Sequence, residues 1–146
     1  MKRWTKLCFV LLALIATGCW GGDQVTPMAA SELRERIAAN QAPVILDVRS
    51  AGEFDAGHVP GATNLPFTDL LKPDGCWRTA AEIRQLLAAA LGDATSAPWA
   101  VMCGSGVTAC HLAVAASLSG ISEPRIYVGS WSEWIRDPSR PVATGR

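Results

Sequence analysis

Short apolar runs alternate along the chain with longer segments in which apolar residues recur at helical spacing. Uninterrupted apolar runs of this length are typical of strands that are buried on both faces of a parallel sheet. We therefore predict strands at residues 44–46, 62–65, 99–102 and 125–128. Because strands and helices alternate, we expect an α/β fold in which helices flank a mainly parallel sheet, with ligands bound off the carboxyl ends of the strands.

The helical spacing predicts four helices, the last of them a short turn, at residues 31–39, 79–91, 109–118 and 131–135. The third segment is apolar almost throughout, as expected of a helix in the centre of a domain. Gly92 and Gly120 follow the second and third segments and supply stop signals. Residues 50–61, rich in glycine and acidic groups, are predicted to form a loop.

Cys103 lies between a predicted strand and a predicted helix, in the segment Cys-Gly-Ser-Gly-Val-Thr at 103–108. Glycine allows backbone N–H groups to turn toward the sulfur, and the positive end of the helix dipole favours an anion there. The pattern predicts a thiolate nucleophile. The alternative, a structural core cysteine, is disfavoured by the two flanking glycines.

The segment 103–109 resembles the active loop of the 3-mercaptopyruvate sulfurtransferase branch of the rhodanese family. Three further segments are similar to family motifs and follow in the same order: Asp47–Arg49, Gly57–Ala62 and Gly129–Trp134. The resemblance implies a rhodanese-like open sandwich. It also implies a sulfurtransferase that moves a sulfane sulfur from a small donor, thiosulfate or 3-mercaptopyruvate, through a cysteine persulfide to a thiol or to cyanide.

By this resemblance Cys103 is the catalytic residue, and neither a metal nor a cofactor is expected. The residues expected to bind the donor are Gly104, Ser105, Gly106, Val107, Thr108 and Arg49. Ser105 can donate a hydrogen bond to the donor, and Thr108 can close the loop through its hydroxyl. Arg49 is expected to be shared between the pocket and a salt bridge to Glu53.

Glu53 stands where two-domain members of the family carry an arginine for the substrate carboxylate. A carboxylate that faced the pocket would repel mercaptopyruvate. Asp47, which also comes at the end of a strand, is expected either near the pocket or as a brace between loops.

Two other functions fit the arrangement of strand, loop and helix. A cysteine phosphatase needs an arginine at the end of a longer loop, but Ala109 lies there and residues 103–120 contain no lysine or arginine. The other is a non-catalytic envelope persulfide carrier or redox-binding module, which the sequence leaves open.

Four other side chains suggest chemistry but are predicted to be structural. His58 is expected to hydrogen-bond the backbone and fix its loop. Cys110 is expected in the core, and Trp131 and Trp134 are expected to pack at the rim of the site. Cys76 lies in a polar loop and is predicted to be exposed.

The first residues read as an export signal, because three basic residues precede the ten apolar residues 7–16. Ten residues are too few to span a bilayer, which needs about twenty. Residues 16–19 resemble a bacterial lipoprotein box, which implies a lipid on Cys19 and a place in the cell envelope. The alternatives are an ordinary cleaved signal, which leaves the protein in the periplasm, and a short uncleaved anchor. The predicted division is a signal at 1–18, a tether at 19–29 and a rhodanese-like domain at 30–146.

Charge and composition limit the classes of molecule that the protein is expected to bind. About half of the residues are apolar, enough for one compact core, and the 13 basic and 13 acidic residues are interspersed. No run of like charge suggests a nucleic-acid surface. The expected partners are a small sulfur donor, a thiol acceptor and, through the lipid, a membrane.

Overall fold

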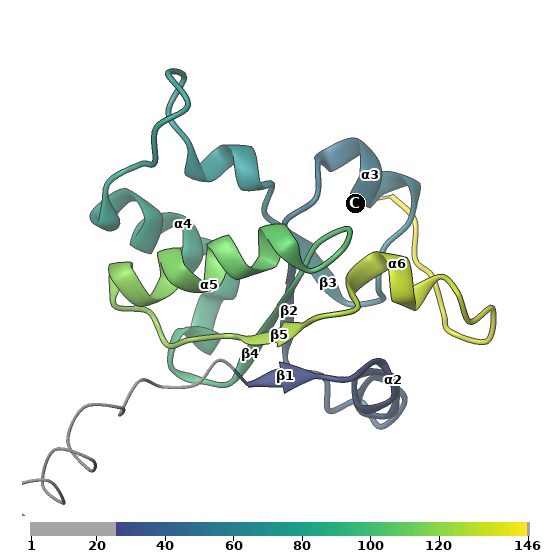
Figure 1. Ribbon diagram of the computed structural model, residues 1–146. Coiled ribbons are helices and arrows are strands. Elements are labelled where there is room, and N and C mark those ends of the chain that lie inside the picture. Colours follow the sequence, from purple (N-terminus) through teal and green to yellow (C-terminus); the bar gives the residue numbers. More distant parts are fainter. Residues whose placement is uncertain (1–25, 146) are drawn as a thin grey trace, which may run out of the picture.

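The computed structural model describes residues 26–145, which form a parallel five-stranded sheet covered by helices on both faces (Figure 1). The strands are β1 (Pro27–Met28), β2 (Val44–Asp47), β3 (Ala62–Asn64), β4 (Trp99–Met102) and β5 (Arg125–Tyr127). They lie in the order β1-β5-β4-β2-β3, and every neighbouring pair is parallel. The α/β fold predicted from the sequence is confirmed, with β4 and β2 inside the sheet.

The helices are α2 (Ala30–Ala38), α3 (Ala51–Ala56), α4 (Ala80–Leu91), α5 (Val107–Ser119) and α6 (Ser130–Trp134), with 3₁₀ turns η1 (Phe67–Leu70) and η2 (Gly92–Ser96). Gly92 and Gly120 end α4 and α5 as predicted, both with positive φ. Helix α5 starts two residues before the predicted position, so Val107 belongs to the helix and not to the loop.

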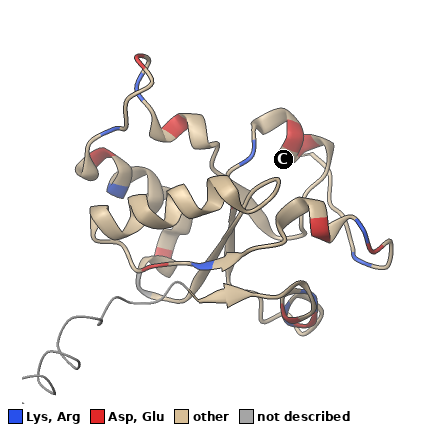
Figure 2. Ribbon diagram, in the orientation of Figure 1, with Lys and Arg blue, Asp and Glu red and all other residues tan. Residues whose placement is uncertain are grey.

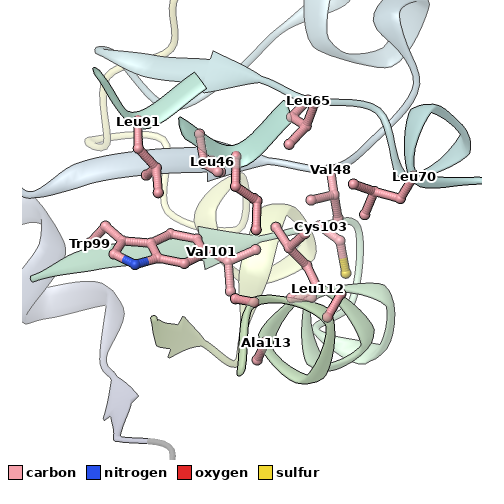
Figure 3. Packing of buried hydrophobic residues seen from close by; sticks show 14 of the residues in the cluster. Leu46, Val48, Leu65, Leu70, Leu91, Trp99, Val101, Cys103, Leu112 and Ala113 are labelled. Atoms are coloured by element: carbon pink, nitrogen blue, oxygen red, sulfur yellow. The ribbon is translucent and has the colours of Figure 1, made fainter. Parts of the chain in front are cut away.

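Alternate residues of the strands divide the interior into two cores. Leu46 and Val101 face a core that also contains the buried side of α4 and α5. Their neighbours Ile45 and Ala100 face the other core, which is closed by α2 and α6. Figure 3 shows Cys103 among the side chains of the first core. The candidate nucleophile is therefore attached to a buried strand end that packs in this core.

The prediction of a loop over residues 50–61 is wrong, because α3 lies within it. The helix is held by a capping box: Ser50 Oγ accepts a hydrogen bond from the Glu53 N–H, and the Glu53 carboxylate accepts one from the Ser50 N–H at 3.0 Å. The Ser-x-x-Glu spacing is the sequence signal of this box. Hydrophobic periodicity did not reveal α3, because a helix of six residues is too short to show a period.

The predicted tether at 19–29 is wrong at its C-terminal end, because Pro27–Met28 pair with β5 and Met28 is buried. Arg125 fixes this strand by donating hydrogen bonds to the Pro27 carbonyl at 2.8 Å and to the Glu32 carboxylate at 2.7 Å. The hydrogen bond from Arg125 lowers the pKa of Glu32 to about 2. The folded domain therefore starts before residue 30.

The predicted signal at 1–18 and the lipidation site Cys19 lie outside the described residues. Within residues 26–145, none of the helices has the length and apolar character needed to cross a bilayer.

Candidate active site

The loop after β4, the segment after β2 and the turn leading into η1 enclose a cavity of about 340 Å³. The carboxyl ends of β2 and β4 meet at this edge because the strands are adjacent and parallel. Besides Cys103, the lining includes four of the six residues predicted to bind the donor: Arg49, Gly104, Ser105 and Thr108. The other two, Gly106 and Val107, line a separate depression together with Cys110 and a residue of β5.

The sulfur of Cys103 is buried, since only 3% of the residue is exposed. Its hydrogen-bond donor in the described structure is the Gly106 N–H, with a nitrogen to Sγ distance of 3.0 Å. Gly106 is the N-cap of α5 and has φ +91°, which a side chain rarely tolerates. This single donor, together with the N-terminus of α5, gives the sulfur a polar, anion-favouring side. The sequence predicts several backbone N–H groups around the sulfur, whereas in the described residues the Gly106 N–H is the donor to it.

The segment after β5 holds the cysteine loop by its backbone. The Cys103 N–H donates to Ser130 Oγ at 3.1 Å, and the Ser130 hydroxyl donates to the Tyr127 carbonyl at 2.8 Å. The N–H groups of Trp131 and Ser132 donate to the carbonyls of Cys103 and Gly104, both at 3.0 Å. The Gly129–Trp134 motif is therefore a clamp on the loop.

Sequence reasoning missed Ser130 as a site residue, although it had recognised the motif that contains it. Ser130 is fully buried and has φ +50° without being glycine. A residue held in that conformation costs free energy and persists only where its surroundings enforce it. Its hydroxyl joins β5 to the loop that holds Cys103, and no pattern within the sequence reveals that contact.

Arg49 is paired with Asp47, and the predicted salt bridge from Arg49 to the Glu53 carboxylate is wrong. The Arg49 Nη2 to Asp47 Oδ2 distance is 2.6 Å, and Arg49 Nε contacts both oxygens of the carboxylate. The guanidinium also donates to the Gly57 carbonyl at 2.8 Å and lies 4.4 Å from the centre of the Trp131 ring. Asp47, fully buried, thus braces the loops through Arg49.

Glu53 lines the cavity and remains charged at neutral pH. Hydrogen bonds from the Ser50 hydroxyl and N–H lower the pKa of its carboxyl below the ordinary value of 4.5, and the nearby Arg49 lowers it further. Its backbone carbonyl, rather than its carboxylate, accepts a hydrogen bond from Arg49, at 3.4 Å. The carboxylate is therefore not neutralised by direct pairing with that arginine.

The surrounding aromatic residues have structural roles. His58 Nδ1 lies 2.9 Å from the Phe54 carbonyl oxygen, and the His58 and Phe54 rings stack at 3.8 Å, so the predicted hydrogen bond to the backbone is present. Trp131 packs against Arg49 beside the cavity, as expected of a residue at the rim of the site. Trp134 is fully buried in the second core, so its predicted place at the rim is wrong.

Cys110 is exposed, and its predicted place in the core is wrong. Its thiol donates to the Gly106 carbonyl at 3.4 Å. The other large side chains on this face of α5 are also exposed, among them Val114 and Leu118. A helix that is apolar all round has no polar face to mark its outside, so periodicity could not place Cys110. Cys76 is exposed as predicted, and the three described cysteines are free.

Among residues 26–145, no cluster of histidine, cysteine and acidic side chains is arranged to hold a metal ion.

The profile of the family described as "Rhodanese-like domain" matches residues 29–137. The chain belongs to the rhodanese family. Residues of this rhodanese chain are 51% identical over 90 positions to the "Probable 3-mercaptopyruvate sulfurtransferase" of Pseudomonas aeruginosa, a match covering 62% of the chain and 32% of that protein. They are 39% identical over 128 positions to the human 3-mercaptopyruvate sulfurtransferase, covering 79% of the chain and 42% of that protein.

The fold agrees with a solved relative. The structure of 3-mercaptopyruvate sulfurtransferase from Leishmania major superposes with a TM-score of 0.64 at 31% identity, covering 79% of this chain and 34% of that one. The rhodanese chain thus spans between about a third and 42% of the length of these relatives.

Gly106→Ala tests how far the loop depends on glycine. A Cβ at this position would lie 2.4 Å from the Val128 carbonyl oxygen, and φ is positive, so the backbone must move. We expect a loss of roughly 1–3 kcal/mol in the free energy of unfolding. We also expect slower alkylation of Cys103, because the shifted backbone moves the residue-106 N–H away from the sulfur. Urea unfolding and timed alkylation followed by peptide mass mapping measure the two effects.

Gly104→Ala is the matched control for stability, because a Cβ there meets no atom within 4 Å and no positive φ is required. Its unfolding midpoint should stay close to that of the wild type. Equal midpoints for the two variants would show that the clash at Gly106 is relieved without cost.

Proposed function

We propose that this protein is a sulfurtransferase in which Cys103 carries a sulfane sulfur from a small donor, thiosulfate or 3-mercaptopyruvate, to a thiol or to cyanide. One observation carries the proposal: the sulfur of Cys103 lies at the N-terminus of α5, accepts the Gly106 N–H, and lines a cavity of about 340 Å³. Membership of the rhodanese family and the relatives named as sulfurtransferases support it.

The chemistry requires two displacements at sulfur. The Cys103 thiolate first attacks the outer sulfur of thiosulfate; the S–S bond of the donor breaks, and sulfite leaves with the electron pair. With mercaptopyruvate the C–S bond breaks instead, and the three-carbon product takes the pair and a proton. Cyanide or a thiolate then attacks the outer sulfur of the persulfide, and the electron pair returns to Cys103.

The protein's part is to hold the sulfur and the loop. The Gly106 N–H stabilises the Cys103 thiolate that attacks the donor and that is released again when the acceptor takes the outer sulfur. The clamp from Ser130 and Trp131 fixes the backbone of Cys103, so the sulfur need not be reoriented between the two steps.

The test is the intact mass of the protein after incubation with thiosulfate or mercaptopyruvate, followed by cyanide. We expect a gain of one sulfur that peptide mapping places on Cys103, and its loss when cyanide is added. Cys76 and Cys110, exposed thiols in the same chain, are internal controls that should carry no stable sulfur. An absent adduct, or one confined to the exposed thiols, would contradict the proposal. A persulfide that no acceptor discharges would indicate a carrier without turnover.

Glu53→Arg is expected to shift donor preference toward mercaptopyruvate, because it replaces a carboxylate that lines the cavity by a group that pairs with the donor's carboxylate. The ratio of kcat/KM for mercaptopyruvate to that for thiosulfate should rise at least roughly tenfold, since a charged hydrogen bond contributes about 1.5 kcal/mol or more. Glu53→Gln, which removes the charge and keeps the capping box, should change the ratio less. An unchanged ratio in Glu53→Arg would show that this side chain does not reach the donor.

We also propose that the protein is exported and held in the bacterial cell envelope by a lipid on Cys19. The support is the basic head, the apolar run at 7–16 and the lipoprotein-like residues 16–19. Expression in a bacterium followed by fractionation and mass analysis of the N-terminal peptide tests it. A lipid-modified N-terminal Cys19 that is lost in Cys19→Ala is expected, whereas an unmodified cleaved N-terminus in the periplasm would overturn the anchor.

A further inference from the structure

The two charged side chains that line the cavity beside Cys103 differ in whether another charged group pairs with them. Within the described residues, the charged side chains of the lining are Arg49 and Glu53. A ligand at the sulfur therefore encounters one cation and one anion. Which of them it responds to depends on how each is already partnered.

Arg49 is not available to a ligand. Its side chain is 4% exposed, and its guanidinium pairs with both oxygens of the fully buried Asp47 carboxylate, through Nε to Oδ1 and through Nη2 to Oδ2. The Gly57 carbonyl accepts a further N–H, and the Trp131 ring covers one face. Removing Arg49 from Asp47 would leave a buried carboxylate unpaired, so recruitment of this arginine by a small anion is strongly unfavourable.

Glu53 is available. Its carboxylate accepts hydrogen bonds from Ser50, which are uncharged donors and leave the negative charge in place. The residue is exposed and lines the cavity. Figure 2 shows the acidic residues on α3, whereas α5 carries no lysine, arginine, aspartate or glutamate. With Arg49 neutralised by Asp47, the charge left facing a ligand is that of Glu53.

We propose that the thiol accepting sulfur from Cys103 is an aminothiol, with an ammonium group close to its sulfur that faces the Glu53 carboxylate. This inference rests on the proposed sulfurtransferase function and names the acceptor class of the same site. An ammonium beside Glu53 brings the attached sulfur to the persulfide, whereas an acidic thiol brings a second negative charge into the cavity.

In the transfer step, the acceptor thiol first loses its proton to solvent. The thiolate then attacks the outer sulfur of the Cys103 persulfide. A new S–S bond forms on the acceptor as the S–S bond to Cys103 breaks, and the electron pair returns to Cys103 as the thiolate. The acceptor leaves as a persulfide with its ammonium unchanged. No oxidant or reductant is needed.

The test separates this step from loading. The whole chain is loaded with thiosulfate, freed of donor by gel filtration, and mixed with cysteamine, 2-mercaptoethanol or 3-mercaptopropionate, which carry a cationic, a neutral and an anionic group. The rate at which the persulfide mass disappears is measured for the wild type and for Glu53→Gln. The ratio of the two rates for each thiol cancels the intrinsic reactivity of that thiol.

Glu82→Gln is the matched control, because Glu82 forms the same kind of capping box with Thr79 at the start of α4 and does not line this cavity. It removes one negative charge of the same kind from the described domain, away from the site. Its rates should follow those of the wild type for all three thiols.

We expect the ratio of wild-type to Glu53→Gln rates to be above one for cysteamine, near one for 2-mercaptoethanol and below one for 3-mercaptopropionate. The spread should be roughly fivefold at low salt and should shrink at high salt, as for a charge pair several ångströms apart near water. Equal ratios for the three thiols, with normal loading, would overturn the aminothiol proposal and leave the sulfurtransferase function standing. Failure to load any sulfur would overturn both.

Discussion

Cys103→Ser will abolish sulfur transfer, lowering kcat/KM for thiocyanate formation by at least about a thousandfold, as expected when a covalent nucleophile is removed. Serine is nearly isosteric, and its oxygen can accept the Gly106 N–H that the sulfur accepts now. It cannot form a persulfide, so the loss is one of chemistry and not of folding. The measurement is steady-state thiocyanate formation from thiosulfate and cyanide.

Cys110→Ser is the control for this experiment. Cys110 lies one helical turn from the loop on α5, but its thiol is exposed and donates a hydrogen bond to the Gly106 carbonyl. The variant should keep most of the activity. If Cys103→Ser retained turnover that Cys110→Ser lost, the nucleophile would have been assigned to the wrong cysteine.

Asp47→Ala should be the most destabilising of the substitutions considered, with a loss of about 3–5 kcal/mol in the free energy of unfolding. Asp47 is fully buried and holds Arg49, which is itself 6% exposed. Removing the carboxylate leaves the guanidinium without its counter-charge in a place that water hardly reaches. Urea unfolding followed by circular dichroism measures the change.

The double variant Asp47→Ala with Arg49→Met serves as the companion measurement. It removes both charges and should recover part of the stability lost in the single variant, because the cost arises from the unpaired cation. A single variant within about 1 kcal/mol of the wild type, the size typical of exposed ion pairs, would show that the pair is solvated.

Cys103 and Asp47 lie at the same edge of the sheet, where the adjacent strands β2 and β4 end. Strand β2 leads into the Asp47 and Arg49 pair that braces the site, and β4 leads into Cys103, the proposed nucleophile. The clamp arrives from a third strand, β5, through Ser130. Asp47 and Ser130, which lie 83 positions apart in the chain, therefore both brace the segments around Cys103.

Much of the fold, and the place of Cys103 as the candidate nucleophile in a loop before a helix, could be predicted from sequence, because both depend on local patterns. Buried strands are apolar without interruption, and amphipathic helices such as α4 repeat every three to four residues. Cys103 was recognisable because glycines and a helix start surround it within six residues. The helix α3 was missed because six residues are too few to show a period, although its capping box was present in the sequence.

What the tertiary structure alone decided is how the charged and polar groups are paired. Arg49 has both Asp47 and Glu53 within four residues along the chain, and only the folded site shows that it binds the buried Asp47 carboxylate and leaves Glu53 facing the cavity. The outward position of Cys110 and the hydrogen bond from Cys103 to Ser130 were likewise invisible. Hydrophobic periodicity records which side chains avoid water. Pairing between polar groups depends on distances across the fold, which are set only after the sheet and helices have packed.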